Sequence, residues 1–441
     1  MTRFGYADAV RALSEALTFG VNPSLDAIGA MTAELGRPQD AYAAVQVTGT
    51  NGKSSVTRLV AAILAEHGVR TGAYTSPHLH SYTERVICEG VRVSEDRFAA
   101  GIAEALAAAR RAGVTPTEFE LLTAAALSIF RECGIDVAVL EVGMGGRWDA
   151  TSVVAPVVAV VTGVGLDHTE HLGETREEIA ADKAHIIKPA SVTVLGPGTI
   201  GVERVFRARV TAVGATAPVL AVRAGLAASP VGEPETVRFT VTADPDAPDA
   251  PMSVDVSGAK AAYRGLELRA PAYQAANVAT AIAASEAFLD RALDAESLRA
   301  ALAAVTFPGR FQVLGRKPWL VADAAHNPEA AGILARAIAA AWPDSAARPT
   351  IVLGVLSDKD VAGMVFALAP VARGFVAVSP DSPRARSAGE VAETIERVTG
   401  ERPEVAQSVV AGVRIALAGN PAGAVVTGSI RTVAEALTRP E

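Results

Sequence analysis

The stretch VQVTGTNGKSS, residues 45–55, carries the clearest chemistry in this sequence. It begins with the alternating pattern of a short strand, and the apolar residues of TRLVAAILAEHG, just after it, recur at helical spacing. Glycines between a strand and a helix let backbone N–H groups and the helix N-terminus hold a phosphate, with a lysine as point charge and a hydroxyl for a cation. The predicted nucleotide-binding residues are Gly49, Thr50, Asn51, Gly52, Lys53, Ser54 and Ser55.

Three predicted strands after this loop end in side chains that could bind a cation. Ser76 follows the first strand, in TSPHLHSYTERV; Glu141 ends the second, and His168 follows the third. Because sites gather at the carboxyl ends of strands in an α/β sheet, and Mg²⁺ prefers oxygen ligands, we predict a Mg²⁺ site at this edge. Two plainer interpretations stay open: a polar surface loop around Ser76, and an ion pair between Glu141 and Arg147.

Two predicted helices carry residues whose role is ambiguous. Lys183 follows several acidic residues on its helix, where a lysine is ordinarily solvated and ion-paired. The spacing of Thr115 and Glu118 resembles a capping box, so we interpret Glu118 as a helix cap. Phe119 lies at the start of the same helix.

The composition bounds the class of protein. The chain has 441 residues, half of them hydrophobic, which predicts a soluble globular protein of two or three domains. A formal net charge of −8 without a basic stripe argues against nucleic-acid and membrane partners and favours small ligands. Two cysteines, Cys88 and Cys133, are too few for a disulfide framework. With no secretory signal at the start, the expected location is the cytoplasm.

The order of the predicted elements indicates an α/β protein with two sheets. Residues 1–305 are predicted to form a P-loop parallel-sheet ATP-binding domain, which begins with helices broken at Asn22-Pro23. It contains a small antiparallel β insertion at about 191–270, with a mobile tip near 243–251.

The C-terminal part repeats a strand and helix pattern four times. TFPGR at 306–310 has linker composition, and residues 311–441 are predicted to form a Rossmann-like, doubly wound domain. Asp323 and His326 lie at its first strand end, beside Asn327, which could also cap the next helix.

These motifs together resemble, in order and spacing, the folylpolyglutamate synthase/dihydrofolate synthase family, within the wider group of muramyl-type ATP-dependent amide ligases. The strings that carry the resemblance are TGTNGKSS, YTSPHLHSYTERV, EVGMGGRWDATS, GLDHTEHLG, DKAHI, YQAANVA, FPGRFQ, DAAHNP and TGSIRTVAEA. They run from about residue 40 to the C-terminus, apart from the insertion. SPHL with YTERV and EVGxGGRxDATx are more particular to the folate branch.

The resemblance implies a ligase that uses ATP to join L-glutamate to dihydropteroate and to reduced folates through an acyl phosphate. It implies an active site between the ATP domain and a glutamate-side C-terminal domain, and we expect a monomer. Besides the loop, the implied nucleotide contacts are Asn277, Arg310, Asp323 and His326. The implied Mg²⁺ ligands are Ser76, Glu141, His168 and a carbamylated Lys183, and the last three are also the implied catalytic residues. The implied pterin site contains Phe119 and Asp149.

Four residues depart from the family's usual motifs. Ser54, His185 and Ala324 stand where glycine is usual, and Trp148 stands where leucine is usual. His185 and Trp148 lie near the carbamate and pterin positions and bear on substrate preference. Two alternatives stay open: a muramyl-peptide-type ligase with another carboxylate acceptor, and a non-catalytic nucleotide switch.

Overall fold

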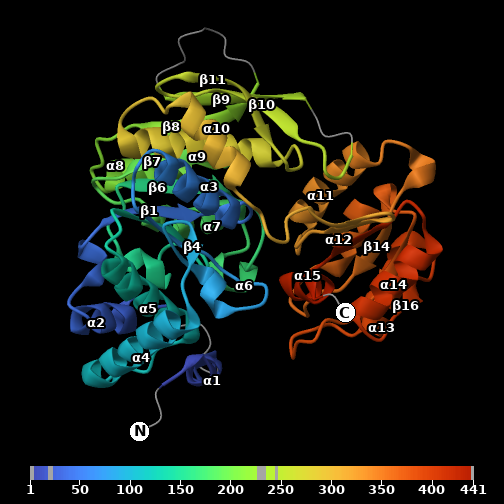
Figure 1. The fold of residues 1–441 in the computed structure, drawn as a ribbon, viewed down its shortest axis with the longest axis horizontal. Helices are drawn as coiled ribbons and strands as arrows, with labels where there is room; N and C mark the ends of the chain where they lie inside the picture. Colours follow the sequence, from blue (N-terminus) through green and yellow to red (C-terminus); the bar gives the residue numbers. More distant parts are fainter. Residues whose placement is uncertain (1–3, 18–22, 226–234, 244–246, 439–441) are drawn as a thin grey trace. The chain divides into compact units, whose positions relative to one another are not determined.

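The computed structural model describes residues 4–17, 23–225, 235–243 and 247–438 (Figure 1). The chain forms two compact units. Unit 1 comprises residues 1–240, 254–266 and 275–305, and unit 2 comprises residues 241–253, 267–274 and 306–441. Asn22, at the predicted break between the first helices, and residues 244–246 of the predicted mobile tip lie outside the described residues.

An eleven-stranded sheet organises unit 1, in the order β11-β10-β9-β8-β7-β6-β1-β5-β2-β3-β4. Its central strands β2, β5, β1 and β6 run parallel, so their carboxyl ends meet at one edge. Every residue of these four strands except Ala43, at the start of β1, is buried, as expected of a parallel sheet covered on both faces. The strands are β1 (Ala43–Thr48), β2 (Thr71–Tyr74), β3 (Val86–Cys88), β4 (Val91–Arg92), β5 (Val137–Glu141), β6 (Val158–Gly163), β7 (Val192–Gly198), β8 (Val219–Ala224), β9 (Thr236–Ala243), β10 (Met252–Ser257) and β11 (Ala262–Leu268).

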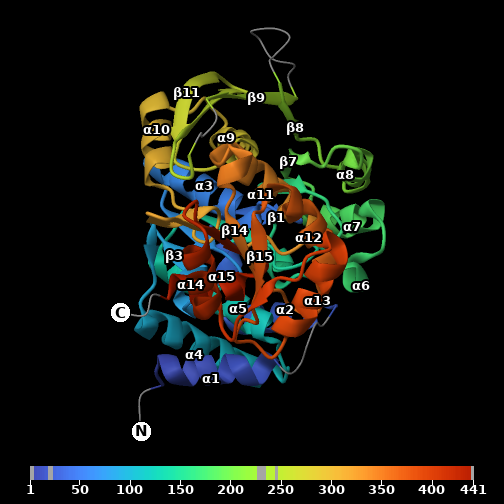
Figure 2. The ribbon, with the colours of Figure 1, turned by 90° about the vertical axis from the view of Figure 1, so that its right-hand side faces the viewer.

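Helices cover this sheet. The helices are α1 (Tyr6–Ala16), α2 (Asp26–Glu34), α3 (Lys53–Glu66), α4 (Glu95–Ala112), α5 (Glu118–Cys133), α6 (Thr169–Leu172), α7 (Arg176–Lys183), α8 (Glu203–Ala212), α9 (Gln274–Leu289) and α10 (Ala295–Ala304). Helix α4 packs on α5, and α1 packs against both (Figure 1, Figure 2). One buried cluster joins these helices to β2 and β5, and another lies between β6, β7, α7 and α8.

The prediction that residues 191–270 form an antiparallel insertion is wrong for the first strands of this segment. β7 pairs in parallel with β6, β8 with β7, and β9 with β8, so these three strands continue the main sheet. Helix α8 supplies the crossover between β7 and β8, which parallel strands require. Short β-branched runs look the same in parallel and antiparallel sheets, and the prediction missed α8.

The capping box at the start of α5 also differs from the prediction. Thr117 is the N-cap, its hydroxyl accepts the Glu120 N–H, and Glu120 Oε2 accepts the Thr117 N–H at 2.8 Å. The sequence carries the Thr-x-x-Glu pattern twice, two residues apart, and the second copy forms the cap. Glu118 is therefore not the cap, and its carboxylate accepts a hydrogen bond from Tyr82 at 2.6 Å instead.

Unit 2 contains a six-stranded sheet in the order β12-β13-β17-β14-β15-β16. All pairs are parallel except β12 with β13, which confirms the predicted doubly wound domain of four β–α units. Buried clusters cover both faces of the sheet. The elements are β12 (Gln312–Arg316), β13 (Trp319–Ala322), α11 (Pro328–Ala341), β14 (Thr350–Leu353), α12 (Val361–Leu368), β15 (Gly374–Ala377), α13 (Ala388–Thr399), β16 (Glu404–Val405), α14 (Val409–Gly419), β17 (Ala424–Thr427) and α15 (Ile430–Leu437).

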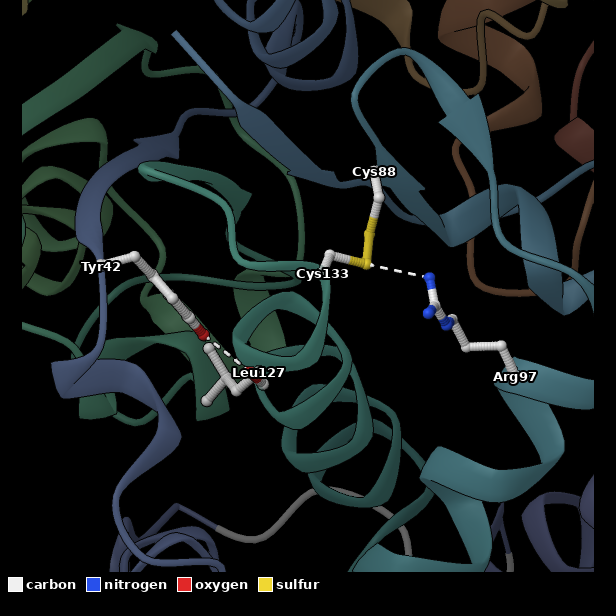
Figure 3. Close-up of a disulfide and its surroundings, with 5 residues drawn as sticks. All are labelled: Tyr42, Cys88, Arg97, Leu127 and Cys133. Carbon is white, nitrogen blue, oxygen red and sulfur yellow. Dashed lines mark hydrogen bonds between the residues drawn. A yellow bond between two sulfur atoms is a disulfide. The ribbon is translucent and has the colours of Figure 1, made fainter.

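A disulfide joins Cys88, at the end of β3, to Cys133, at the end of α5 (Figure 3). Arg97 of α4 donates a hydrogen bond to the Cys133 sulfur at 3.4 Å. The cysteine count did not predict this pairing, because the two residues are 45 positions apart and only the fold brings them together. None of the helices in the described part of the chain has the length and apolar character needed to cross a bilayer.

Candidate active site

The predicted nucleotide-binding loop connects β1 to α3, and its glycines fit positions that other residues could not occupy. Gly49 and Gly52 have φ angles of 150° and 86°, in the region that favours glycine. A Cβ on Gly49 would lie 1.9 Å from Thr162 Oγ1, and one on Gly52 would lie 2.6 Å from Asn277 Oδ1. Asn277, on α9, therefore borders the loop.

Hydrogen bonds connect the loop to the end of β6 and the residues just after it. Thr162 Oγ1 donates a hydrogen bond to the Asn51 carbonyl at 2.6 Å, and the Thr50 N–H donates to the Gly163 carbonyl at 3.0 Å. The Gly165 N–H donates to Thr50 Oγ1 at 2.9 Å. The sequence alone does not single out Thr162, because a threonine at a strand end has no recognisable role until β6 is known to lie beside β1.

Lys53 is the first residue of α3, and its charge lies over the loop. Its Nζ donates hydrogen bonds to the carbonyls of Gly49 at 2.9 Å and Thr50 at 3.2 Å. The N–H groups of the first turn of α3 lie at the same place. This arrangement of charge and N–H groups suits a phosphate.

Glu141 connects the phosphate loop to the loop after β2. Its side chain is 1% exposed at the end of β5. Oε1 accepts a hydrogen bond from Ser54 Oγ at 2.8 Å, and Oε2 accepts one from the Ser76 N–H at 2.9 Å. The Arg147 guanidinium lies over the Trp148 ring, 4.7 Å from its centroid. A buried carboxylate with hydroxyl neighbours fits a hard divalent cation.

Lys183, at the end of α7, is only 3% exposed, so the interpretation of a solvated lysine is wrong. Burial lowers the pKa of Lys183 from 10.5 to about 7, and the positive charge of Lys53 adds to this effect. The carboxylates of Asp182, Asp167 and Asp149 oppose the shift. An amine with this pKa is about half neutral near pH 7, and the neutral form is the one that can act as a nucleophile.

The glycine-rich turn after β5 explains why Lys183 is buried. A Cβ on Gly146 would lie 2.7 Å from the Lys183 carbonyl oxygen, and one on Gly145 would lie 2.2 Å from Asp182 Oδ1. The Gly145 carbonyl accepts a hydrogen bond from Thr48 Oγ1 at 2.6 Å. The absence of side chains at Gly145 and Gly146 thus lets the end of α7 approach the end of β1.

The same turn brings the predicted pterin residues Phe119 and Asp149 together. A Cβ on Gly143 would lie 2.7 Å from Phe119 Cζ and 3.1 Å from Asp149 Oδ2. Asp149 is 7% exposed and accepts hydrogen bonds from the N–H groups of Met144 and Thr151, both at 3.0 Å. Burial raises the pKa of Asp149 above its ordinary value.

His168 follows β6 at the edge where β5 and β2 end. It is exposed, has a left-handed φ of 52°, and its N–H donates to Asp167 Oδ1 at 3.0 Å. In the described ranges, no three His, Cys, Asp or Glu side chains are grouped so as to hold a metal ion. Of the predicted ligands, only Glu141 and His168 are of these types. The predicted site therefore also depends on the Ser76 hydroxyl and on carbamylation of Lys183.

Unit 2 brings Asp323 together with the turn that contains Arg310. Asp323 is 5% exposed, and its Oδ2 accepts hydrogen bonds from Tyr273 Oη at 2.9 Å and the Phe311 N–H at 2.8 Å. Burial raises the pKa of Tyr273, and the positive charge of Arg310 partly opposes the shift. The sequence alone does not single out Tyr273, although this residue begins the YQAANVA string.

His326 and Asn327 lie between β13 and α11. Nδ1 of His326 is 3.0 Å from the Ala324 carbonyl oxygen. Asn327 Oδ1 accepts the Ala330 N–H at 2.8 Å, which confirms that Asn327 caps α11 with Pro328 at the first helical position.

Comparison with known proteins finds matches to both the N-terminal and the C-terminal part of the chain. A family model described as "Mur ligase middle domain" matches residues 47–195, and one described as "Mur ligase, glutamate ligase domain" matches residues 309–430. A protein of Mycobacterium tuberculosis named dihydrofolate synthase/folylpolyglutamate synthase is 35% identical, over 95% of this chain and 90% of that protein. The chain belongs to the dihydrofolate synthase/folylpolyglutamate synthase family.

Solved structures of this family share the fold. The folylpolyglutamate synthase of Mycobacterium tuberculosis, complexed with ADP and AMPPCP, is 34% identical with a TM-score of 0.87, over 99% of each chain. A bifunctional folylpolyglutamate synthase/dihydrofolate synthase with Mn, AMPPNP and L-glutamate bound is 29% identical with a TM-score of 0.83, over 98% of this chain and 97% of that one.

Proposed function

We propose that this chain is a bifunctional ATP-dependent ligase that joins L-glutamate to dihydropteroate and to reduced folates. The observation that carries the proposal is the junction at Glu141, where the phosphate loop, through Ser54, meets the SPHL loop, through Ser76. The first loop is the expected ATP site, and the second belongs to a string particular to the folate branch. A nucleotide switch has no need of such a connection.

The reaction follows from the chemistry of a carboxylate, which is a poor acylating agent. An oxygen of the acceptor's carboxylate attacks the γ-phosphorus of ATP, the bond to ADP breaks, and an acyl phosphate forms. The amine of glutamate then attacks the acyl carbon, inorganic phosphate leaves, and the nitrogen loses a proton. Lys53 and the N–H groups of the loop stabilise charge on the transferred phosphoryl group, and the protein supplies no covalent nucleophile.

A divalent cation, proposed to be Mg²⁺, neutralises phosphate charge when bound. Its proposed ligands are Ser76, Glu141, His168 and carbamylated Lys183, and the buried oxygen donors at Glu141 support this choice. The carbamate forms when the neutral Lys183 amine attacks CO₂: an N–C bond forms, and the nitrogen releases one proton. A pKa of about 7 supports this step because a substantial fraction of the amine, about half near pH 7, is then neutral.

The remaining proposed ligand contacts come from residues in both units. In unit 1, Asn277 is proposed to contact the nucleotide, and Phe119 and Asp149 the pterin. In unit 2, Arg310, Asp323 and His326 are proposed nucleotide contacts.

The proposed functional division is an ATP domain at 1–305, a linker at 306–310 and a glutamate-side domain at 311–441. Its boundary at residue 305 agrees with the last segment of unit 1. We propose that the enzyme acts as a monomer in the cytoplasm, where ATP and folates are available.

The test is release of phosphate from ATP with dihydropteroate or tetrahydrofolate, each with and without glutamate. We expect sustained release with either acceptor only when glutamate is present. Release that requires a UDP-muramyl acceptor would identify a muramyl-type ligase instead. Turnover that ignores acceptor and glutamate would favour the nucleotide switch, and activity with only one folate acceptor would refute bifunctionality.

A further inference from the structure

Helix α1 contacts the loop between β2 and β3 through one side chain, Tyr6. The Tyr6 hydroxyl lies 2.9 Å from Ser81 Oγ and accepts the Tyr82 N–H at 3.1 Å. Its ring packs on the buried Phe98 of α4, with centroids 5.8 Å apart. The first helix, which showed no chemistry in the sequence, therefore holds part of the SPHLHSYTERV string.

The contacted loop is internally ordered around Glu84. This carboxylate accepts hydrogen bonds from the N–H groups of Leu79 at 2.9 Å, His80 at 3.0 Å and Ser81 at 2.8 Å. Three backbone donors on one carboxylate fix the path of the chain through this turn. A contact at Ser81 consequently positions the whole turn and not one residue of it.

Tyr82 continues this connection toward the proposed pterin site. Its hydroxyl donates to Glu118 Oε1 at 2.6 Å, and its ring lies 4.3 Å from the His78 ring and 5.3 Å from the Arg85 guanidinium. Glu118 is the first residue of α5, and the next residue is Phe119. The hydrogen bond therefore ties the loop to the helical turn that presents Phe119.

We propose that Tyr6 is a positioning residue for the folate acceptor. It fixes the Ser81–Tyr82 turn, and through Tyr82 and Glu118 it sets the place of Phe119, against which a bicyclic pterin would lie. The proposal rests on the proposed function, because it requires a pterin acceptor. A purely structural role for Tyr6 would change stability without separating acceptor binding from ATP binding.

The experiment compares Tyr6→Phe with Tyr42→Phe in the full-length enzyme. Tyr42 is a matched control, since its hydroxyl also makes a hydrogen bond to α5, at 2.9 Å to the Leu127 carbonyl, but does not touch the loop (Figure 3). We expect Tyr6→Phe to raise the KM for dihydropteroate about five- to tenfold, the range for loss of one or two hydrogen bonds. The KM for ATP and kcat should stay within about twofold in both variants.

Tyr82→Phe and the double variant test the path. Tyr82→Phe should raise the acceptor KM by a similar factor, and the double variant should exceed the larger single effect by less than about twofold, because both changes break one connection. If the increases in acceptor KM of the two single variants multiply in the double variant, Tyr6 does not act through Tyr82. An unchanged acceptor KM in Tyr6→Phe, or an equal rise in Tyr42→Phe, would overturn the inference while leaving the ligase intact. A wild-type enzyme that ignores every pterin acceptor would instead refute the proposed function and this inference with it.

Discussion

Replacing Lys183 by methionine should stabilise the metal-free protein while removing its activity. The charged form of this buried lysine is unfavourable in the folded state, where burial lowers its pKa from 10.5 to about 7. Methionine is unbranched and only one heavy atom shorter than lysine, and it removes the charge. The free energy of unfolding should therefore rise in the variant, whereas a solvated lysine would give no change.

The magnitude depends on pH in a defined direction. Below about pH 7 the lysine is protonated in both states, and the shift in pKa corresponds to a penalty of about 5 kcal/mol at about 1.4 kcal/mol per unit. Between about pH 7 and 10.5 only the unfolded state holds the proton, so the stability of the wild type rises with pH. At pH 9 the penalty is about 2 kcal/mol, and it disappears above 10.5. These are upper limits for the variant, because three nearby carboxylates lose a cationic neighbour.

The assay is thermal unfolding of both proteins in CO₂-free buffer with a chelator, at about pH 6 and pH 9. We expect the methionine variant to unfold at a higher temperature, with a clearly larger difference at pH 6. Lys260→Met is the control, since this exposed lysine pairs with Asp290 at 2.7 Å and its loss should change stability by less than about 1 kcal/mol at either pH. A Lys183→Met variant that is destabilised, or whose stability difference is the same at both pH values, would refute the reasoning.

Three further predictions concern the phosphate loop and the cation. Lys53→Ala should lower the rate of ATP turnover by about 10²-fold or more without lowering the melting temperature, and near-normal turnover would remove the loop from the mechanism. Gly52→Ala should weaken ATP binding, measured by calorimetry, because the new Cβ would meet Asn277 Oδ1 at 2.6 Å; normal affinity would show that the loop adapts. Glu141→Gln should lose activity that high Mg²⁺ partly restores, and an activity indifferent to Mg²⁺ would contradict its role as a ligand.

Local sequence predicted the features whose residues are adjacent in the chain. The phosphate loop follows from glycines and a lysine between a strand and a helix, and the structure places Lys53 over that loop. The four β–α units of unit 2 follow from repeated apolar strands, each followed by a helical pattern. The prediction that parallel strands end at one sheet edge placed Ser76 near Glu141, and the structure confirms that these two residues are in contact.

Features that depend on contacts between distant segments of the chain were not predicted from the sequence. The burial of Lys183 arises from its contact with the turn at Gly146, and its acidic helix alone indicated a solvated residue. The contact of Tyr6 with Ser81 spans 75 positions. The parallel pairing of β8 with β7 depends on the crossover helix α8, which the prediction missed. In each case the deciding interaction is tertiary, so no local pattern could contain it.

The most direct test of the central claim follows an oxygen atom. Dihydropteroate labelled with oxygen-18 in its carboxylate is incubated with the enzyme, ATP, Mg²⁺ and L-glutamate, and the released phosphate is analysed by mass spectrometry. An acyl phosphate requires one carboxylate oxygen to leave with the phosphate, so we predict one labelled oxygen per phosphate released, together with glutamylated product. Phosphate without the label, or phosphate released without glutamylated product, would contradict the account.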